Sequence, residues 1–109
     1  AFERALAVNP GFVIAQINLG SVWMQKGRYL EAFEAYEKAA RLDPGSAQVQ
    51  FAIANASFQL RRYDQAIAHY EKALELNPNY PDAAQNLATA RAQKRLSESV
   101  FFDPPPRTP

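Results

Sequence analysis

The sequence predicts an all-α protein built as a right-handed helical-hairpin solenoid. Two observations predict this class. Prolines recur every 34 residues, as Pro10, Pro44 and Pro78, and each follows an asparagine or an aspartate. Within each interval the apolar residues lie three and four positions apart, as on a helix with one buried face, and strand-like alternation is not sustained. A fixed period of this length is typical of solenoids, in which each unit stacks only on its neighbours.

From its pattern, we expect the chain to open inside a helix. Residues 1–8 carry an amphipathic pattern, and the Asn9–Pro10 pair ends it, because the residue before a proline is driven away from helical backbone angles. We therefore expect residues 1–12 to supply the second helix of a preceding repeat that has lost its first helix. On this interpretation the chain is a fragment of a larger protein.

Two complete units follow, and one helix closes the stack. Gly27 separates the helices of the first unit, since glycine adopts the left-handed conformation that ends a helix at little steric cost. Arg61 takes that place in the second unit, so we expect a strained or differently shaped turn there. Pro81 and Asp82 suit the start of the last helix, whose basic residues indicate a polar cap. The expected helices span about 1–8, 13–26, 29–42, 47–60, 63–76 and 81–98, and the units span 13–46, 47–80 and the cap 81–98.

The tail, residues 99–109, differs from the rest of the chain. Three consecutive prolines forbid a helix and favour an extended coil, while Phe101 and Phe102 are unusual for a plain linker because adjacent aromatic residues favour burial. The tail is therefore a linker, a ligand for a proline-recognition module or a disordered segment. A further hypothesis is that Val100 to Pro104 packs in a groove or against a solenoid end and imitates a natural peptide ligand.

Composition excludes several classes of function. Lys and Arg total 12 and Asp and Glu total 11, which argues against nucleic acid as the main partner. No apolar run approaches the roughly 20 residues that span a bilayer, so we expect no membrane insertion. The chain has no cysteine, which rules out thiolate metal sites and fits a reducing compartment, and the cytoplasm is the expected location. We expect no cofactor, no metal and no enzymatic activity, because no phosphate loop, metal cluster or nucleophile–base set is present.

The repeated residues resemble the tetratricopeptide-repeat family, whose 34-residue pattern places Leu, a small residue, Ala, an aromatic, Ala and Pro at fixed positions. Small residues let the two helices of a unit cross closely, with Gly20 expected opposite Ala32 and Ala54 opposite Ala66. Gln16, Gln50 and Ser57 depart from the aromatic positions of the pattern. The structural repeat positions are Leu19, Gly20, Trp23, Ala32, Tyr36, Ala39, Pro44, Ile53, Ala54, Ala66, Tyr70, Ala73 and Pro78.

The resemblance implies a binding surface, because members of the family bind extended peptides or partner helices in a concave groove lined by the first helix of each repeat. The alternative is that bulky residues at these positions only cover neighbouring helices. The corresponding residues here are Ile14, Ile17, Asn18, Ser21, Met24, Gln25, Gln48, Phe51, Asn55, Phe58, Gln59, Asp82, Gln85, Asn86, Thr89 and Gln93.

Some family members clamp the C-terminal carboxylate of heat-shock chaperones with Lys, Asn and Arg. Asn55 and Asn86 occupy two clamp-like places, but Phe51 and Asp82 stand where lysines are needed. Two asparagines cannot neutralise a carboxylate, so we reject this ligand. His69, the only histidine, is interpreted as a surface residue on the outer face of its helix, because it has no catalytic partners in the sequence pattern.

The resulting functional hypothesis is a protein–protein interaction scaffold that binds a peptide or a partner helix in the groove. The alternative is an assembly or accessory module, which mediates oligomerisation or docks to a fused catalytic or membrane domain through the solenoid ends. Self-association through the N-terminal helix or through the 99–109 tail is part of that alternative.

Overall fold

A computed structural model of the chain describes residues 10–101, and within that range every regular element is an α-helix. The all-α helical-hairpin solenoid predicted from the sequence is confirmed. The helix expected at residues 1–8 and the tail from residue 102 lie outside the described residues. The helices are α2 (Pro10–Gln25), α3 (Tyr29–Leu42), α4 (Ala47–Gln59), α5 (Tyr63–Leu76) and α6 (Pro81–Phe101).

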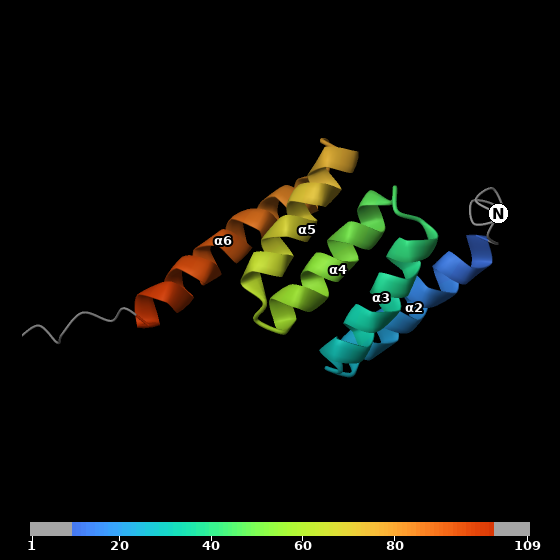
Figure 1. Cartoon of the computed structure of the whole chain (residues 1–109), viewed down its shortest axis with the longest axis horizontal. Helices are drawn as coiled ribbons and strands as arrows, with labels where there is room; N and C mark the ends of the chain where they lie inside the picture. The colour runs from blue at the N-terminus through green and yellow to red at the C-terminus, as the bar shows by residue number, and fades with distance from the viewer. Residues whose placement is uncertain (1–9, 102–109) are drawn as a thin grey trace, which may run out of the picture.

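The helices stack in chain order. α2 packs on α3 and α4 on α5 within the two units, while α3 meets α4 and α5 meets α6 between units (Figure 1). α2 also touches α4, so the first helices of successive units form a layer of their own. This layer places the side chains of α2, α4 and α6 along one surface of the stack.

The turns inside the two units have the same shape despite their different residues. Gly27 has φ 74° and Arg61 has φ 61°, both in the left-handed region. In each turn the following N–H reaches back to a carbonyl oxygen five residues earlier, from Arg28 to Trp23 at 2.8 Å and from Arg62 to Ser57 at 2.9 Å. The expected strain at Arg61 is therefore present, because a side chain is held where glycine is favoured.

Two helix boundaries differ from the sequence-based expectation by three residues, while the other described boundaries agree to within one residue. α2 begins at Pro10 rather than at residue 13, because proline is compatible with the first turn of a helix, where its missing N–H leaves no bond unmade. α6 continues to Phe101, so residues 99–101, expected to be extended, are helical. The prolines that forbid a helix begin only at Pro104, and no helix breaker precedes them in this stretch.

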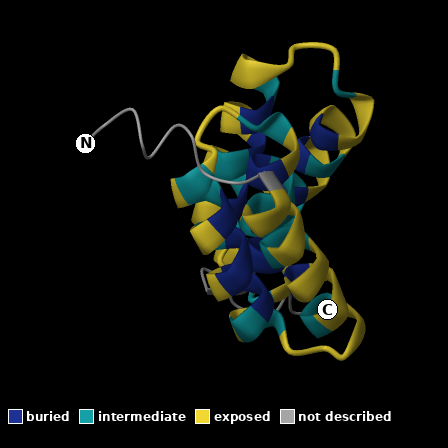
Figure 2. Cartoon of the chain, turned by 90° about the vertical axis from the view of Figure 1, so that its right-hand side faces the viewer, coloured by how far each residue is buried: buried dark blue, intermediate teal, exposed yellow. Residues whose placement is uncertain are grey.

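The core runs through the interior of the stack and forms two clusters, each of which joins neighbouring units (Figure 2). The first cluster joins α3 to α4 and the second joins α4 and α5 to α6. The heavy atoms nearest to a Cβ built on Gly20 belong to the Tyr36 ring, with Cδ1 and Cζ at 2.6 and 2.7 Å, so Gly20 packs closely against Tyr36. The buried residues of the two clusters are Ala32, Phe33, Tyr36, Ala39, Val49, Ile53 and Ala56, and Ala54, Ala66, Tyr70, Leu87 and Ala90.

No described residue covers the face of α2 that carries Leu19 and Val22. Ile53 and Ala56 of α4 are 2% and 0% exposed, because α3 covers them. Their counterparts 34 residues earlier, Leu19 and Val22, are 44% and 45% exposed. Leu19, expected as a structural repeat position, is therefore not buried here, since the helix that would cover it corresponds to residues outside the described range.

Candidate functional site

Two hollows lie along the surface formed by the first helices of the units. The first hollow, about 370 Å³, is walled by α2 and α4 and is also lined by Tyr36 of α3. The second, about 360 Å³, lies mainly between α4 and α6. Met24 and Asn55 line both hollows, so together they form one surface that we call the groove. The first hollow is lined by Ile17, Ser21, Met24, Gln25, Tyr36, Gln48, Phe51, Ala52 and Asn55, and the second by Met24, Asn55, Phe58, Gln59, Tyr70, Asn86 and Thr89.

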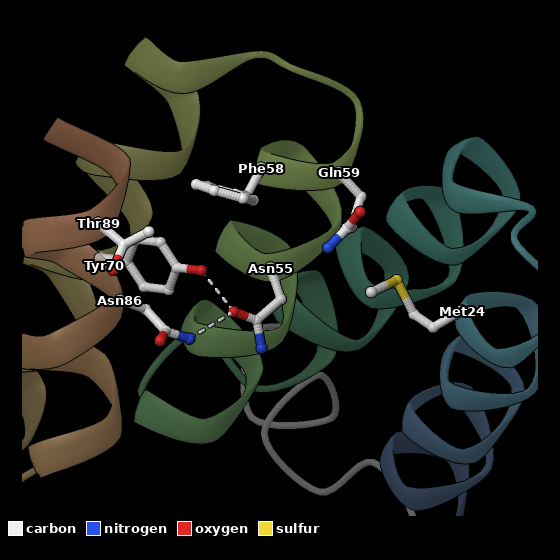
Figure 3. A pocket seen from close by; sticks show the side chains of 7 residues that line it. All are labelled: Met24, Asn55, Phe58, Gln59, Tyr70, Asn86 and Thr89. Atoms are coloured by element: carbon white, nitrogen blue, oxygen red, sulfur yellow. Dashed lines mark hydrogen bonds between the residues drawn. The ribbon is translucent and has the colours of Figure 1, made fainter. Parts of the chain in front are cut away.

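A hydrogen-bonded network from three helices lies in the second hollow (Figure 3). The Tyr70 hydroxyl on α5 donates to Asn55 Oδ1 on α4, and Asn86 Nδ2 on α6 donates to the same oxygen at 3.2 Å. Burial raises the pKa of Tyr70 to about 12, partly offset by the neighbouring Asn86 amide. The hydroxyl therefore stays protonated at neutral pH and remains a donor that fixes the Asn55 side chain.

Aromatic contacts hold the groove walls in place. The Phe51 ring lies between two tyrosine rings, with centroids 5.9 Å from Tyr70 and 5.0 Å from Tyr80. Phe58 meets Tyr63 edge to face at 5.5 Å. These contacts orient Phe51 and Phe58, because tilted and edge-to-face aromatic pairs have preferred geometries.

The structure brings together most of the residues that the family pattern indicated for the groove. Each hollow is walled by neighbouring helices, and the indicated residues that line neither hollow lie on the outermost two, α2 and α6. The residues that line a hollow as indicated are Ile17, Ser21, Met24, Gln25, Gln48, Phe51, Asn55, Phe58, Gln59, Asn86 and Thr89. Those that line neither are Ile14, Asn18, Asp82, Gln85 and Gln93.

Sequence reasoning missed the contribution of the second helices. Tyr36 and Tyr70, assigned a structural role only, also line the groove. Each hydroxyl lies near a polar side chain 15 residues earlier, Ser21 at 3.4 Å for Tyr36 and Asn55 for Tyr70. This repeated spacing of 15 residues is the sequence signal that could have indicated which groove residues the tyrosines support.

The interpretation of His69 as a surface residue on the outer face is wrong. His69 is half-buried, and its Nδ1 lies 2.8 Å from Oε1 of the buried Gln50. Burial lowers the pKa of His69, partly countered by Glu37 and reinforced by Lys72. His69 thus pairs with the glutamine that replaces the aromatic residue of the family pattern, and it lies in the interface between α4 and α5.

Neither a metal-binding cluster nor a membrane-spanning helix occurs among residues 10–101. No three metal-binding side chains of types His, Cys, Asp or Glu come together in this part of the chain. None of the helices described combines the length and the apolar character needed to cross a membrane.

Three family models of the tetratricopeptide repeat match the chain in succession, over residues 1–47, 47–80 and 69–98. The chain belongs to the tetratricopeptide-repeat family. The matches extend over nearly all of the sequence before the proline-rich tail, including the segment before residue 10, and agree with the helix pairs of the structure. No curated protein shows a significant sequence match to this tetratricopeptide-repeat chain.

Solved tetratricopeptide-repeat structures share this fold. The TPR2AB-domain:pHSP90 complex of yeast Sti1 superposes with a TM-score of 0.80 at 28% identity, covering 89% of this chain and 38% of that one. The Sgt2 TPR domain from Aspergillus fumigatus gives 0.75 at 25% identity, covering 99% and 72%. The second TPR of Spaghetti (RPAP3), bound to the HSP90 peptide SRMEEVD, gives 0.72 at 23%, covering 84% and 91%. The chain thus spans well under half the length of the Sti1 chain.

Proposed function

We propose that this tetratricopeptide-repeat segment is a protein–protein interaction scaffold that binds a peptide or a partner helix in the groove and performs no catalysis. The observation that carries the proposal is the groove itself. Apolar side chains such as Met24 and Phe58 line it beside amide groups such as that of Gln59, which has no hydrogen-bond partner among residues 10–101. This combination suits the side chains and the backbone of a bound chain. The yeast Sti1 relative, solved as a complex with pHSP90, supports a role in protein binding.

The groove is also held in shape without a ligand. The network of Tyr70, Asn55 and Asn86 joins three helices, and the aromatic contacts of Phe51 hold this residue in the wall of the first hollow. A surface that is formed in advance loses less conformational entropy on binding than one that must be ordered by its ligand. These features favour recognition by the groove over the view that its bulky residues only cover neighbouring helices.

The experiment is a selection of peptides from a displayed random library on the full chain, followed by measurement of Kd by fluorescence polarisation. Met24→Ala should weaken the selected peptides about fivefold or more, because Met24 lines both hollows. Leu30→Ala is the matched control, since Leu30 is an exposed apolar residue of α3 outside the groove. Failure to select any peptide, or equal losses in the two variants, would reject binding in the groove.

As a second candidate we propose assembly through the α2 end of the solenoid. The exposed face of Leu19 and Val22 favours it, because the equivalent face of α4 is completely covered by the preceding helix. The repeat register indicates segment 1–8 as the occupant, since Phe2 and Ala5 correspond to Tyr36 and Ala39 of the covering helix α3. Assembly results when this segment packs on α2 of a second copy of the chain.

Light scattering after size-exclusion chromatography separates the alternatives. A dimer that Leu19→Glu converts to a monomer supports assembly, with Leu30→Glu as the control because Leu30 has a similar exposure of 46%. If the unsubstituted chain is a monomer, segment 1–8 does not join two copies and the assembly candidate is wrong.

A further inference from the structure

The groove carries no formal charge. Every described residue that lines either hollow is neutral at pH 7, although the chain contains 12 basic and 11 acidic residues. The ion pairs lie elsewhere, with Arg28–Glu31 on α3 and its N-terminal turn and with Arg91–Glu71 and Lys94–Asp64 between α5 and α6. A charged ligand group would lose hydration in the groove without meeting an opposite charge, which is costly.

Asn55 and Asn86 together offer the groove one hydrogen-bond donor beside one acceptor. Asn55 Oδ1 is occupied by Tyr70 and Asn86, which leaves Asn55 Nδ2 without a partner among residues 10–101 (Figure 3). Asn86 Nδ2 is occupied in the same way, which leaves Asn86 Oδ1 as an acceptor. A peptide unit offers both N–H and C=O and can satisfy both groups, whereas a carboxylate offers only acceptors.

The space beside this amide pair suits a large apolar side chain. The second hollow has a volume of about 360 Å³ and is lined by Phe58 beside Asn55 on α4 and by Met24, which faces them from α2 (Figure 3). Phe58 is oriented by Tyr63, while the Met24 side chain can adapt its shape because it is unbranched. One wall is therefore fixed and the other is adjustable, as expected for an anchor site that accepts several apolar residues.

We propose that the groove recognises an internal, extended peptide segment without charge at its contacts, anchored by one large apolar side chain between Met24 and Phe58. The backbone next to that anchor pairs with Asn55 Nδ2 and Asn86 Oδ1. A free C-terminal carboxylate and acidic side chains are not part of the recognition. This inference rests on the proposed function and specifies the ligand class of the same groove.

The test uses the peptides selected above, each synthesised with a free C-terminal acid and with a C-terminal amide. We expect the two forms to bind within about twofold of each other, and Kd to change less than about twofold between 50 and 500 mM salt, because uncharged contacts are not screened. The acidic peptide SRMEEVD serves as a reference and should bind at least tenfold more weakly.

Three results would each overturn the ligand class while leaving groove binding intact. They are free-acid peptides that bind at least tenfold more tightly than their amides, selected peptides with an acidic consensus, and binding that salt weakens strongly. A failure of the proposed function is distinct, since no selected peptide would then respond to Met24→Ala. Asn86→Asp provides a further check: it keeps the size of the side chain but adds a negative charge, and it should weaken amidated peptides and SRMEEVD alike. Tighter binding of any acidic peptide to this variant would contradict the proposal.

Discussion

Tyr36 and Tyr70 occupy equivalent positions 34 residues apart, and both rings are buried, but their hydroxyl groups meet different partners. The Tyr70 hydroxyl donates to Asn55 Oδ1, whereas the Tyr36 hydroxyl lies 3.4 Å from Ser21 Oγ, beyond the usual length of such a bond. Replacing each tyrosine by phenylalanine removes only the oxygen and keeps the packed ring. The two substitutions therefore compare a hydrogen bond with a loose polar contact in the same structural setting.

The size of the effect follows from what remains after each substitution. In Tyr70→Phe, Asn55 Oδ1 keeps its bond from Asn86 Nδ2 at 3.2 Å, so no acceptor is left unpaired. The loss is then that of one net hydrogen bond, about 1 kcal/mol of the free energy of unfolding. For Tyr36→Phe we expect a loss below about 0.5 kcal/mol, because a 3.4 Å contact contributes little.

Urea unfolding followed by circular dichroism at pH 7.5 measures both values. A loss of about 1 kcal/mol should also lower Tm by roughly 4–8 °C for a chain of this size. The pKa of Tyr70 is raised to about 12, so the hydroxyl is protonated throughout the accessible pH range and its ionisation does not complicate the result. Equal losses in the two variants, or a larger loss for Tyr36→Phe, would refute the assignment of the network.

Three further predictions follow from buried or strained positions. Gly20→Ala should lower the free energy of unfolding by about 1 kcal/mol, since overpacking against the Tyr36 ring outweighs the gain in helix propensity; a stabilised variant in urea unfolding would contradict this. Arg61→Gly should raise stability by about 0.5–1 kcal/mol by relieving the left-handed strain, while Gly27→Ala should lower it by about 1 kcal/mol, and thermal unfolding distinguishes the two signs. Burial lowers the pKa of His69, so as the pH falls the histidine is protonated in the unfolded chain before it is protonated in the folded one. The contribution of His69 to the free energy of unfolding should therefore be fully present above the unfolded pKa near 6.5 and should be lost as the pH drops below it. His69→Gln should flatten urea stability between pH 7.5 and 5.5, and an unchanged slope would be the contrary result.

The sequence by itself determined the repeat, the fold class and the turns. The 34-residue period, the spacing of apolar residues and the Asp–Pro and Asn–Pro pairs are properties of short stretches, and backbone sterics act on them locally. The positions of α3 and α5 could therefore be predicted closely. The start of α2 could not, because Pro10 is compatible either with ending one helix or with beginning the next.

Most of the groove could also be predicted, because a fixed repeat places equivalent residues on equivalent helix faces. The tertiary structure decided which of these groove residues share a hollow. A hollow needs a wall on each side, and some indicated residues of the outermost helices α2 and α6 have a neighbouring helix on one side only. The bonds of Asn55 with Tyr70 and Asn86, and of His69 with Gln50, depend on how three helices approach one another and on which side-chain rotamers then fit. Those distances are set by packing between helices, which no single stretch of sequence contains.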